Sequence, residues 1–369
     1  MKKRLSIVLC MTLMATSLLA GCKKKEEAPE PTETVSEAEE TETETGKDGM
    51  ARSYLTGEWI DKDLAKKKPV AIMIGNTNDA LPQYGLSQAD VLYEAPAEGG
   101  ITRLMPIFQD YSGLDKIGSV RSCRHYYAYY AMEFDAIYIH YGQAIYATEL
   151  LESGKVEDLN GLEGAIDSAT FYRDKSRKAP HNAFVSTDGI DAGIELKGYD
   201  TELPSDYEGH YQFNEDDEKE IELTDGADAA VVQPGYYVNN PWFVYNSEDG
   251  LYYRFQYKKE HMDENTGTQL AFKNILLQYC DYTKLDDAHG YLDVESTGEG
   301  TGKYITNGKV IDVTWKKASE NEPTRYYDAS GNEITLNQGK TMVCVLLNDM
   351  EKKLNIYATE DEFTPPSAK

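Results

Sequence analysis

The chain has 369 residues, a formal net charge of −27 and a hydrophobic content of 40%. This excess of carboxylates argues against a nucleic-acid-binding protein, whose surface is basic. The apolar fraction is large enough to fill packed cores, which excludes a chain that is disordered throughout. The length suggests about two domains. Five cysteines at irregular spacing argue against a disulfide framework.

A basic start and a short apolar run open the chain. Lys2, Lys3 and Arg4 precede an apolar run over residues 5–19, which is shorter than a membrane span of roughly 20 residues and typical of a signal peptide. The Leu-Ala-Gly sequence before Cys22 resembles a bacterial lipobox. We therefore predict a signal peptide over 1–21, cleavage before Cys22 and acylation of Cys22, with palmitate as the expected lipid. The alternative is an ordinary secretory signal with an accidental cysteine.

A polar segment follows the cysteine. Residues 23–50 begin with three lysines and continue with a run rich in Glu, Thr and Pro, with little that could be buried. Such a composition is typical of disorder. We predict a lipidated, disordered acidic tether over 22–56 that holds the folded part away from the lipid.

The next segment, 57–200, alternates between strand and helix patterns. Buried-strand runs and helical spacing of apolar residues follow one another along it. The expected strands cover 69–74, 91–94, 102–108 and 136–140, and the expected helices cover 122–134, 144–151 and 188–196. This pattern predicts a mixed α/β N-terminal domain.

An acidic stretch poor in apolar residues, 201–225, predicts a linker. After it, Tyr, Val and Thr dominate, and residues 251–257 and 309–315 alternate as strands do. Asn307-Gly308 and Ser330-Gly331-Asn332 are hairpin signals. We predict a mainly β C-terminal domain over 226–358 and a tail over 359–369.

The most informative cluster is Arg121-Ser122-Cys123-Arg124-His125. Ser122 is a suitable N-cap for the expected helix, and the free N–H groups of a helix start favour anions. Arginines beside that end would suit a carboxylate or a phosphate, which a guanidinium can grip through two oxygens. The alternative is a purely structural network in which nearby carboxylates pair with the arginines, the candidates being Glu94, Glu98, Glu133 and Asp135.

Cys123 and the stretch 173–182 offer two weaker suggestions. A thiol between Arg and His could be a nucleophile, but His125 lies on a different helical face, so a small buried thiol is the favoured interpretation. The stretch 173–182 is basic in an acidic protein and could focus an anionic partner, or could be a solvated loop. His181 and Asn182 follow Pro180 in what we interpret as a fixed turn.

Sequence motifs typical of several enzyme classes and of metal sites are absent. Residues 298–304 are one residue short of a phosphate-binding loop, and neither a Gly-x-Ser-x-Gly elbow nor an HExxH or Cys-x-x-Cys pattern occurs. We expect no cofactor and no metal site.

Longer motifs resemble a known family. The run 89–103 is similar to the hallmark of the YerB-like lipoproteins of Gram-positive bacteria, and so are 116–122 with Arg124 and 179–182. In the second half the similarity includes these segments: 261–263, 266–267, 302–304, 314–317 and 324–326. The resemblance covers about residues 57–350. Cys123 departs from the pattern, in which a small residue is expected.

The resemblance implies a two-domain α+β fold with layered sheets, an N-terminal domain of unknown function and a C-terminal companion. It also implies a lipoprotein on the extracytoplasmic face of the cell membrane, but no catalytic residues. The family motifs and the charge pattern together select one candidate ligand site in the first domain, made of Glu98, Arg103, Arg121, Arg124, His181 and Asn182.

We therefore expect a non-catalytic lipoprotein of the cell envelope that binds a cell-wall component or a wall-synthesis protein. One alternative is a hydrolase or transferase acting on peptidoglycan or another wall polymer, with Glu98 or His181 as general acid or base. Another is a receptor for a small anionic ligand. The expected partners are the lipid bilayer, through acylated Cys22, and a wall polymer or wall-synthesis protein, but no nucleic acid.

Overall fold

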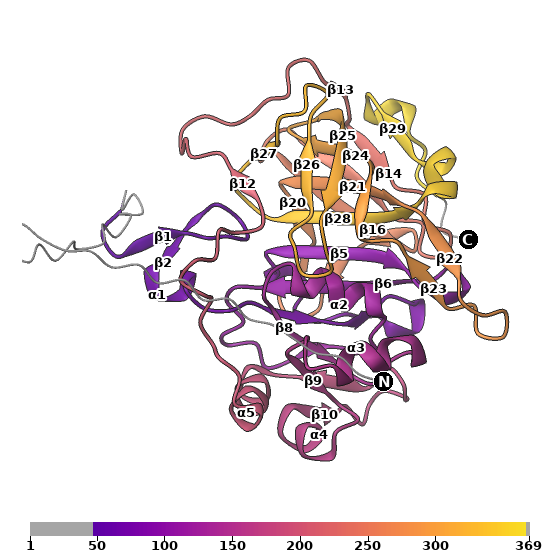
Figure 1. Ribbon diagram of the computed structural model, residues 1–369. Coiled ribbons are helices and arrows are strands. Elements are labelled where there is room, and N and C mark those ends of the chain that lie inside the picture. Colours follow the sequence, from indigo (N-terminus) through magenta and orange to yellow (C-terminus); the bar gives the residue numbers. More distant parts are fainter. Residues whose placement is uncertain (1–46, 367–369) are drawn as a thin grey trace, which may run out of the picture. The chain divides into compact units, whose positions relative to one another are not determined.

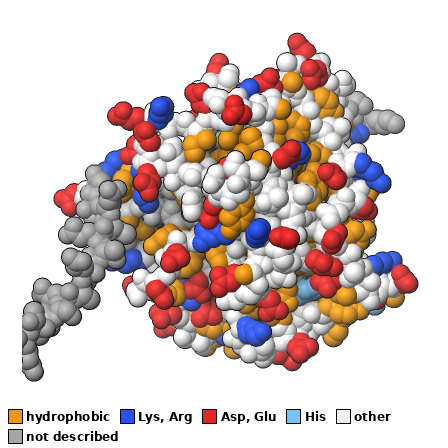
Figure 2. Space-filling view, turned by 45° about the horizontal axis from the view of Figure 1, so that its top comes forward, with side chains coloured by type: hydrophobic (Ala, Val, Ile, Leu, Met, Phe, Trp, Pro, Cys, Tyr) orange, Lys and Arg blue, Asp and Glu red, His pale blue; other side chains and the backbone are white. Residues whose placement is uncertain are grey.

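A computed structural model describes residues 47–366 of the chain. The predicted signal peptide, Cys22 and most of the predicted tether lie outside the described residues. Within the described residues, no helix is both long and apolar enough to cross a bilayer. Acidic side chains are spread over the face that Figure 2 shows.

The central feature is a twelve-stranded mixed sheet to which both halves of the chain contribute (Figure 1). Its main path, in spatial order, is β13 (Ala227–Asp228), β25 (Lys309–Lys317), β24 (Gly298–Thr306), β21 (Asn274–Cys280), β28 (Thr341–Leu347), β5 (Val91–Pro96), β6 (Thr102–Phe108), β3 (Val70–Ile72), β8 (Ile137–His140) and β9 (Asp158–Asn160). Two further strands pair off this path, β26 (Arg325–Tyr327) with β25 and β4 (Ile74–Gly75) with β6.

The two halves of the chain meet where β28 runs parallel to β5. The register pairs Thr341 with Val91 and Cys344 with Glu94. Every residue of both strands is buried. Strands that are covered on both faces read as continuous apolar runs, as these largely do. The middle of the sheet is therefore part of the core of both halves.

Smaller sheets complete the β structure. A six-stranded sheet from the second half contains β14 (Val231–Gln233), β15 (Trp242–Asn246), β16 (Leu251–Gln256), β17 (Lys259–Glu260), β20 (Ala271–Phe272) and β29 (Asn355–Tyr357). A three-stranded sheet from the first half contains β7 (Ile117–Gly118), β10 (Phe171–Arg173) and β11 (Ala183–Val185). The two-domain α+β prediction is confirmed.

The longer helices all belong to the first half: α2 (His125–Met132), α3 (Thr148–Glu152), α4 (Gly164–Thr170) and α5 (Thr187–Lys197). Helix α5 confirms the prediction for 188–196. It begins after Ser186, whose side chain accepts a hydrogen bond from the N–H of Gly189, and ends at Gly198 in the left-handed conformation. Residues 144–151 form a short 3₁₀ turn and α3 rather than one helix.

The helix predicted for 122–134 starts later than expected. Ser122 does not cap it; its hydroxyl donates to the carbonyl of Tyr141, and Arg124 occupies the cap position without a side-chain cap. Residues 121–123 instead pair with neighbouring extended chain, since the N–H of Arg121 donates to Met73 and that of Cys123 to Gly142. These bonds keep the segment extended and delay the first helical turn.

Both predicted ends of the folded region also need correction. The tether was predicted to reach residue 56, yet β1 (Met50–Arg52) pairs with β2 (Trp59–Asp61), and Leu55 is buried. The tail predicted from 359 packs as well, because Phe363 contacts the ring of Trp242. A single apolar residue in a polar stretch gives no periodic signal. The sequence pattern therefore predicts neither the burial of Leu55 nor the packing of Phe363 on Trp242.

Candidate functional site

The candidate site is built around the turn between β5 and β6. Glu98, Gly99 and Gly100 form this turn, and both glycines have positive φ angles of 70° and 76°. Glycine adopts such angles without steric cost, which allows a tight reversal here. The turn projects Glu98 at the end of the hairpin, and Arg103 lies in β6 shortly after it.

Two tyrosines of α2 hold the helix against this hairpin. The hydroxyl of Tyr126 donates to the carbonyl of Pro96 at 2.7 Å, and the hydroxyl of Tyr127 donates to that of Arg103 at 2.6 Å. Both rings are fully buried, so their hydroxyls require such partners. Because α2 is fixed in this way, Arg124 at its start lies beside Glu98.

Arg124 and Glu98 form a two-pronged ion pair. Arg124 Nε donates to Glu98 Oε2 at 2.9 Å, and Nη2 donates to Oε1. Arg124 Nη1 is also engaged, by the carbonyls of Ser122 and Cys123. Burial tends to raise the pKa of Glu98, but Arg124 outweighs it and lowers this pKa below its usual value. Arg124 is therefore satisfied internally, as the structural alternative expects.

Arg103 lacks such a partner. Its side chain is 5% exposed, and its nearest carboxylate oxygen among the described residues is Glu98 Oε1 at 3.9 Å, which already serves Arg124. Arg103 Nε is buried with no hydrogen-bond partner within residues 47–366. Burial, and then the charges of Arg124 and Arg121, lower the pKa of Arg103 to about 10. An anion would relieve this unfavourable arrangement.

The side chain of Arg121 passes over Gly75, which is paired with Arg103. Strand β4 pairs Gly75 with Arg103, so their side-chain directions share one face of the sheet. A Cβ on Gly75 would lie 3.0 Å from Cγ of Arg121, which shows that the arginine stem crosses the gap that glycine leaves. Arg121 Nη1 donates to the carbonyl of Pro180 at 2.8 Å. Burial and Arg124 lower the pKa of Arg121.

His181 joins the cluster and Asn182 does not. Burial and the neighbouring Arg121 lower the pKa of His181, so the imidazole is neutral at pH 7, and its Nδ1 is buried without a partner among the described residues. The side chain of Asn182 accepts a hydrogen bond from Arg173 at 2.9 Å, and this engagement occupies its amide oxygen.

Cys123 is not a nucleophile candidate. Its side chain is fully buried, and burial raises the pKa of the thiol to about 12. The thiol donates to the backbone carbonyl of Arg124 at 3.3 Å. It stays protonated at any physiological pH.

The cluster therefore gathers three guanidinium groups and one carboxylate. Arg124 neutralises Glu98, which leaves Arg103 and Arg121 beside neutral His181. This arrangement can hold a carboxylate or a phosphate. It suits acid catalysis poorly, because a general acid needs a raised pKa and Glu98 has a lowered one.

The sequence did not reveal a second charged cluster, which lies at the junction of the two halves. Glu94 of β5 pairs with Arg254 of β16 at 2.7 Å, and both side chains are fully buried. Arg254 Nη1 donates to Nδ1 of His261, whose other ring nitrogen meets Oε1 of Gln83. Burial and Arg254 lower the pKa of His261 well below its usual value. Because nothing here reaches solvent, this network joins the halves rather than binding a ligand.

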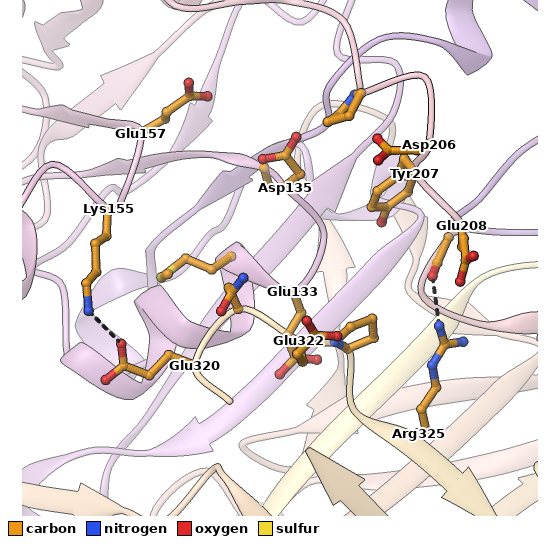
Figure 3. A pocket seen from close by; sticks show the side chains of 16 residues that line it. Glu133, Asp135, Lys155, Glu157, Asp206, Tyr207, Glu208, Glu320, Glu322 and Arg325 are labelled. Atoms are coloured by element: carbon orange, nitrogen blue, oxygen red, sulfur yellow. Dashed lines mark hydrogen bonds and ion pairs between the residues drawn. The ribbon is translucent and has the colours of Figure 1, made fainter. Parts of the chain in front are cut away.

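A separate groove, lined mainly by acidic residues, lies elsewhere on the described residues (Figure 3). It has a volume of about 780 Å³, and Figure 3 shows carboxylates from several segments around it. The labelled carboxylates are Glu133, Asp135, Glu157, Asp206, Glu208, Glu320 and Glu322. Among the described residues, the positively charged side chains that line it are Lys155 and Arg325. Such a lining repels anions, so this groove does not share the chemistry of the arginine cluster.

Comparisons with known proteins follow the division of the chain into halves. Residues 55–200 match the family model described as the N-terminal domain of a protein of unknown function, DUF3048, and residues 230–343 match its C-terminal domain. The chain is 29% identical over 330 residues to a Bacillus subtilis (strain 168) protein named "Putative lipoprotein YerB", covering 86% of this chain and 88% of that one. The crystal structure of YerB protein from Bacillus subtilis is similar with a TM-score of 0.73, covering 83% of this chain and 99% of the other.

Proposed function

The chain belongs to the DUF3048 family, and we propose that it is a lipid-anchored protein on the extracytoplasmic face of the membrane. We propose further that it binds an anionic group of a cell-wall component and does not act as an enzyme. Its similarity to a protein named as a lipoprotein supports the anchor. The anionic group, a carboxylate or a phosphate, would lie against Arg103 and Arg121.

One observation carries the binding proposal. Arg103 is a buried cation whose Nε has no partner within residues 47–366 and whose nearest carboxylate is already used by Arg124. Leaving a buried charge unpaired is costly, and proteins usually compensate such a group with a counter-ion. Arg121, which has no carboxylate partner in the described part of the chain, stands on the same face.

Two features favour binding over the enzymatic alternative. The ion pair with Arg124 keeps Glu98 ionised, so it is a poor proton donor. His181 could accept a proton, but burial and the charges of three arginines outweigh nearby Asp79 and oppose the positive charge it would gain.

The experiment uses the full-length protein in detergent and purified Gram-positive cell walls. Wild type should sediment with the walls, and inorganic phosphate should compete. Arg121→Ala should bind about 10- to 100-fold more weakly, which corresponds to the loss of one charge-assisted contact of roughly 1.5–3 kcal/mol.

The matched control is Lys309→Ala, which removes one positive charge from the surface of β25, where Lys309 pairs with Asp228. This variant should bind as wild type does. Equal binding by wild type and Arg121→Ala would overturn the proposal.

A further inference from the structure

A second cavity lies directly beside the turn that carries Glu98. Its volume is about 520 Å³, and both halves of the chain line it. The first half contributes Ala97, Gly99 and Gly100. The second half contributes the loop before β15, the hairpin of β22 (Tyr282–Lys284) and β23 (Leu292–Val294), and the 3₁₀ segment Asn348–Lys353.

Exposed tyrosine rings border this cavity. Tyr237 is 53% exposed and Tyr282 is 36% exposed, whereas the adjacent Tyr236 is buried with its hydroxyl bonded to backbone carbonyls. Lys353 Nζ lies 3.2 Å from the centroid of the Tyr237 ring and helps to orient it. Exposed aromatic rings at a concave surface are typical of a binding site rather than of a core.

Polar side chains at this cavity contact one another. Lys284 pairs with Asp287 at 3.0 Å, and His289 lies 3.3 Å from Asp286. The hydroxyl of Tyr282 donates to Asp349 at 3.3 Å. A lining of this kind offers many hydrogen-bonding atoms and little net charge. It suits a neutral body rich in hydroxyl or amide groups that also has an apolar face for the tyrosines.

The cavity and the arginine cluster share one wall. Ala97 and Gly99 line the cavity, while Glu98 between them turns its side chain to Arg124. Consecutive Cα atoms are about 3.8 Å apart, so the backbone that carries Glu98 directly adjoins the backbone that lines the cavity. The guanidinium of Arg124 also lies 5.3 Å from the ring of Tyr291, which is in the hairpin that borders the cavity. The cavity and the Glu98–Arg124 pair therefore border the same turn and the same hairpin.

We infer that this cavity is a sugar subsite, and that the ligand is a sugar residue bearing an anionic group. The ring would lie against Tyr237 and Tyr282, and its carboxylate or phosphate would reach the arginines. This inference rests on the proposed function, because the arginine cluster supplies the anionic half of the site.

Titration calorimetry with the full-length protein in detergent tests the inference. The charged probes are N-acetylmuramic acid, which carries a carboxylate, and N-acetylglucosamine-6-phosphate. The reference probes are inorganic phosphate, acetate and neutral N-acetylglucosamine. We expect either N-acetylmuramic acid to bind at least tenfold more tightly than acetate, or N-acetylglucosamine-6-phosphate to bind at least tenfold more tightly than inorganic phosphate. The sugar that shows this gain identifies the anionic group as a carboxylate or a phosphate.

Two variants test the role of the exposed tyrosine rings that border the cavity. Tyr237→Ala and Tyr282→Ala should each remove most of the advantage of the charged sugar and leave the binding of inorganic phosphate unchanged. Tyr253→Ala is the control, since this tyrosine lies on β16, bonded to Asp249, and does not line the cavity.

The failures of the two proposals are distinguishable. If phosphate binds and needs Arg121, but the charged sugars gain nothing or keep their gain in both tyrosine variants, the sugar subsite is wrong and the anion site stands. If neither phosphate nor any charged sugar binds, both proposals are wrong.

Discussion

At the residue scale, each of the four carboxylates that could neutralise the arginine motif has a cationic partner. Glu98 pairs with Arg124, Glu94 with Arg254, Glu133 with Lys317, and Asp135 with Lys68. Three of the four carboxylates that could have neutralised the cluster are therefore committed elsewhere. This distribution leaves Arg103 and Arg121 without a carboxylate of their own in the described part of the chain.

Glu98→Gln tests this distribution of charge. Removing the carboxylate leaves three arginines facing one another, so the free energy of unfolding should fall by about 2 kcal/mol, as for other charged hydrogen bonds. The affinity for inorganic phosphate should rise several-fold, because the competing anion is gone. Urea unfolding and calorimetry measure the two quantities. A fall in phosphate affinity would mean that Glu98 does not compete for the arginines.

The lowered pKa of His261 leads to a prediction about how the free energy of unfolding depends on pH. Its pKa in the folded protein lies well below 6.5, so below about pH 6.5 the unfolded chain takes up a proton that the folded protein does not. The free energy of unfolding should therefore fall on acidification, by at most about 1.4 kcal/mol per pH unit for this group. His261→Gln should weaken this dependence between pH 6.5 and 5.5. Urea unfolding at both pH values checks it, and an unchanged slope would contradict it.

At the scale of elements, local patterns predicted the strands and α5 well. Residues 102–108 and 309–315 are strands, as their apolar run and their alternation indicate. The pairing of β28 with β5 could not be predicted, because it joins segments about 250 residues apart and no local pattern encodes the partner of a buried strand. For the same reason the motif indicated Arg121 and Arg124, but not which of them a carboxylate would neutralise.

The shared sheet leads to a prediction about proteolysis. Residues 215–220 of the predicted linker are exposed, so a trace of protease should cut there. The two fragments should stay together on gel filtration, because β28 remains paired with β5 and the buried Glu94–Arg254 pair still joins them. They should separate in denaturant. Fragments that separate under native conditions would show that the halves are independently stable.

At the scale of the whole molecule, the anchor and the folded part make separate predictions. Cys22 lies outside the described residues, and its acylation stays a prediction. If it is acylated, the mature protein should partition with membranes, and Cys22→Ala should accumulate as an unprocessed precursor. Membrane fractionation and the mass of the intact protein check this. Normal processing and membrane retention of the variant would contradict the predicted lipidation.

The binding proposal requires that Arg103 and Arg121 are positive charges without a counter-ion in the folded protein. The melting temperature of the full-length protein in increasing inorganic phosphate tests this claim most directly, with wild type, Arg121→Ala and Lys309→Ala compared side by side. A ligand that binds only the folded state raises its stability by about 1.4 kcal/mol for each tenfold increase above the dissociation constant.

Wild type and Lys309→Ala should gain stability with phosphate. Arg121→Ala should melt no lower than wild type without phosphate, because the variant relieves repulsion, and phosphate should raise its melting temperature far less than that of wild type. An Arg121→Ala variant that melts far below wild type, or a wild type whose melting temperature does not respond to phosphate, would contradict the claim that these arginines lack a counter-ion.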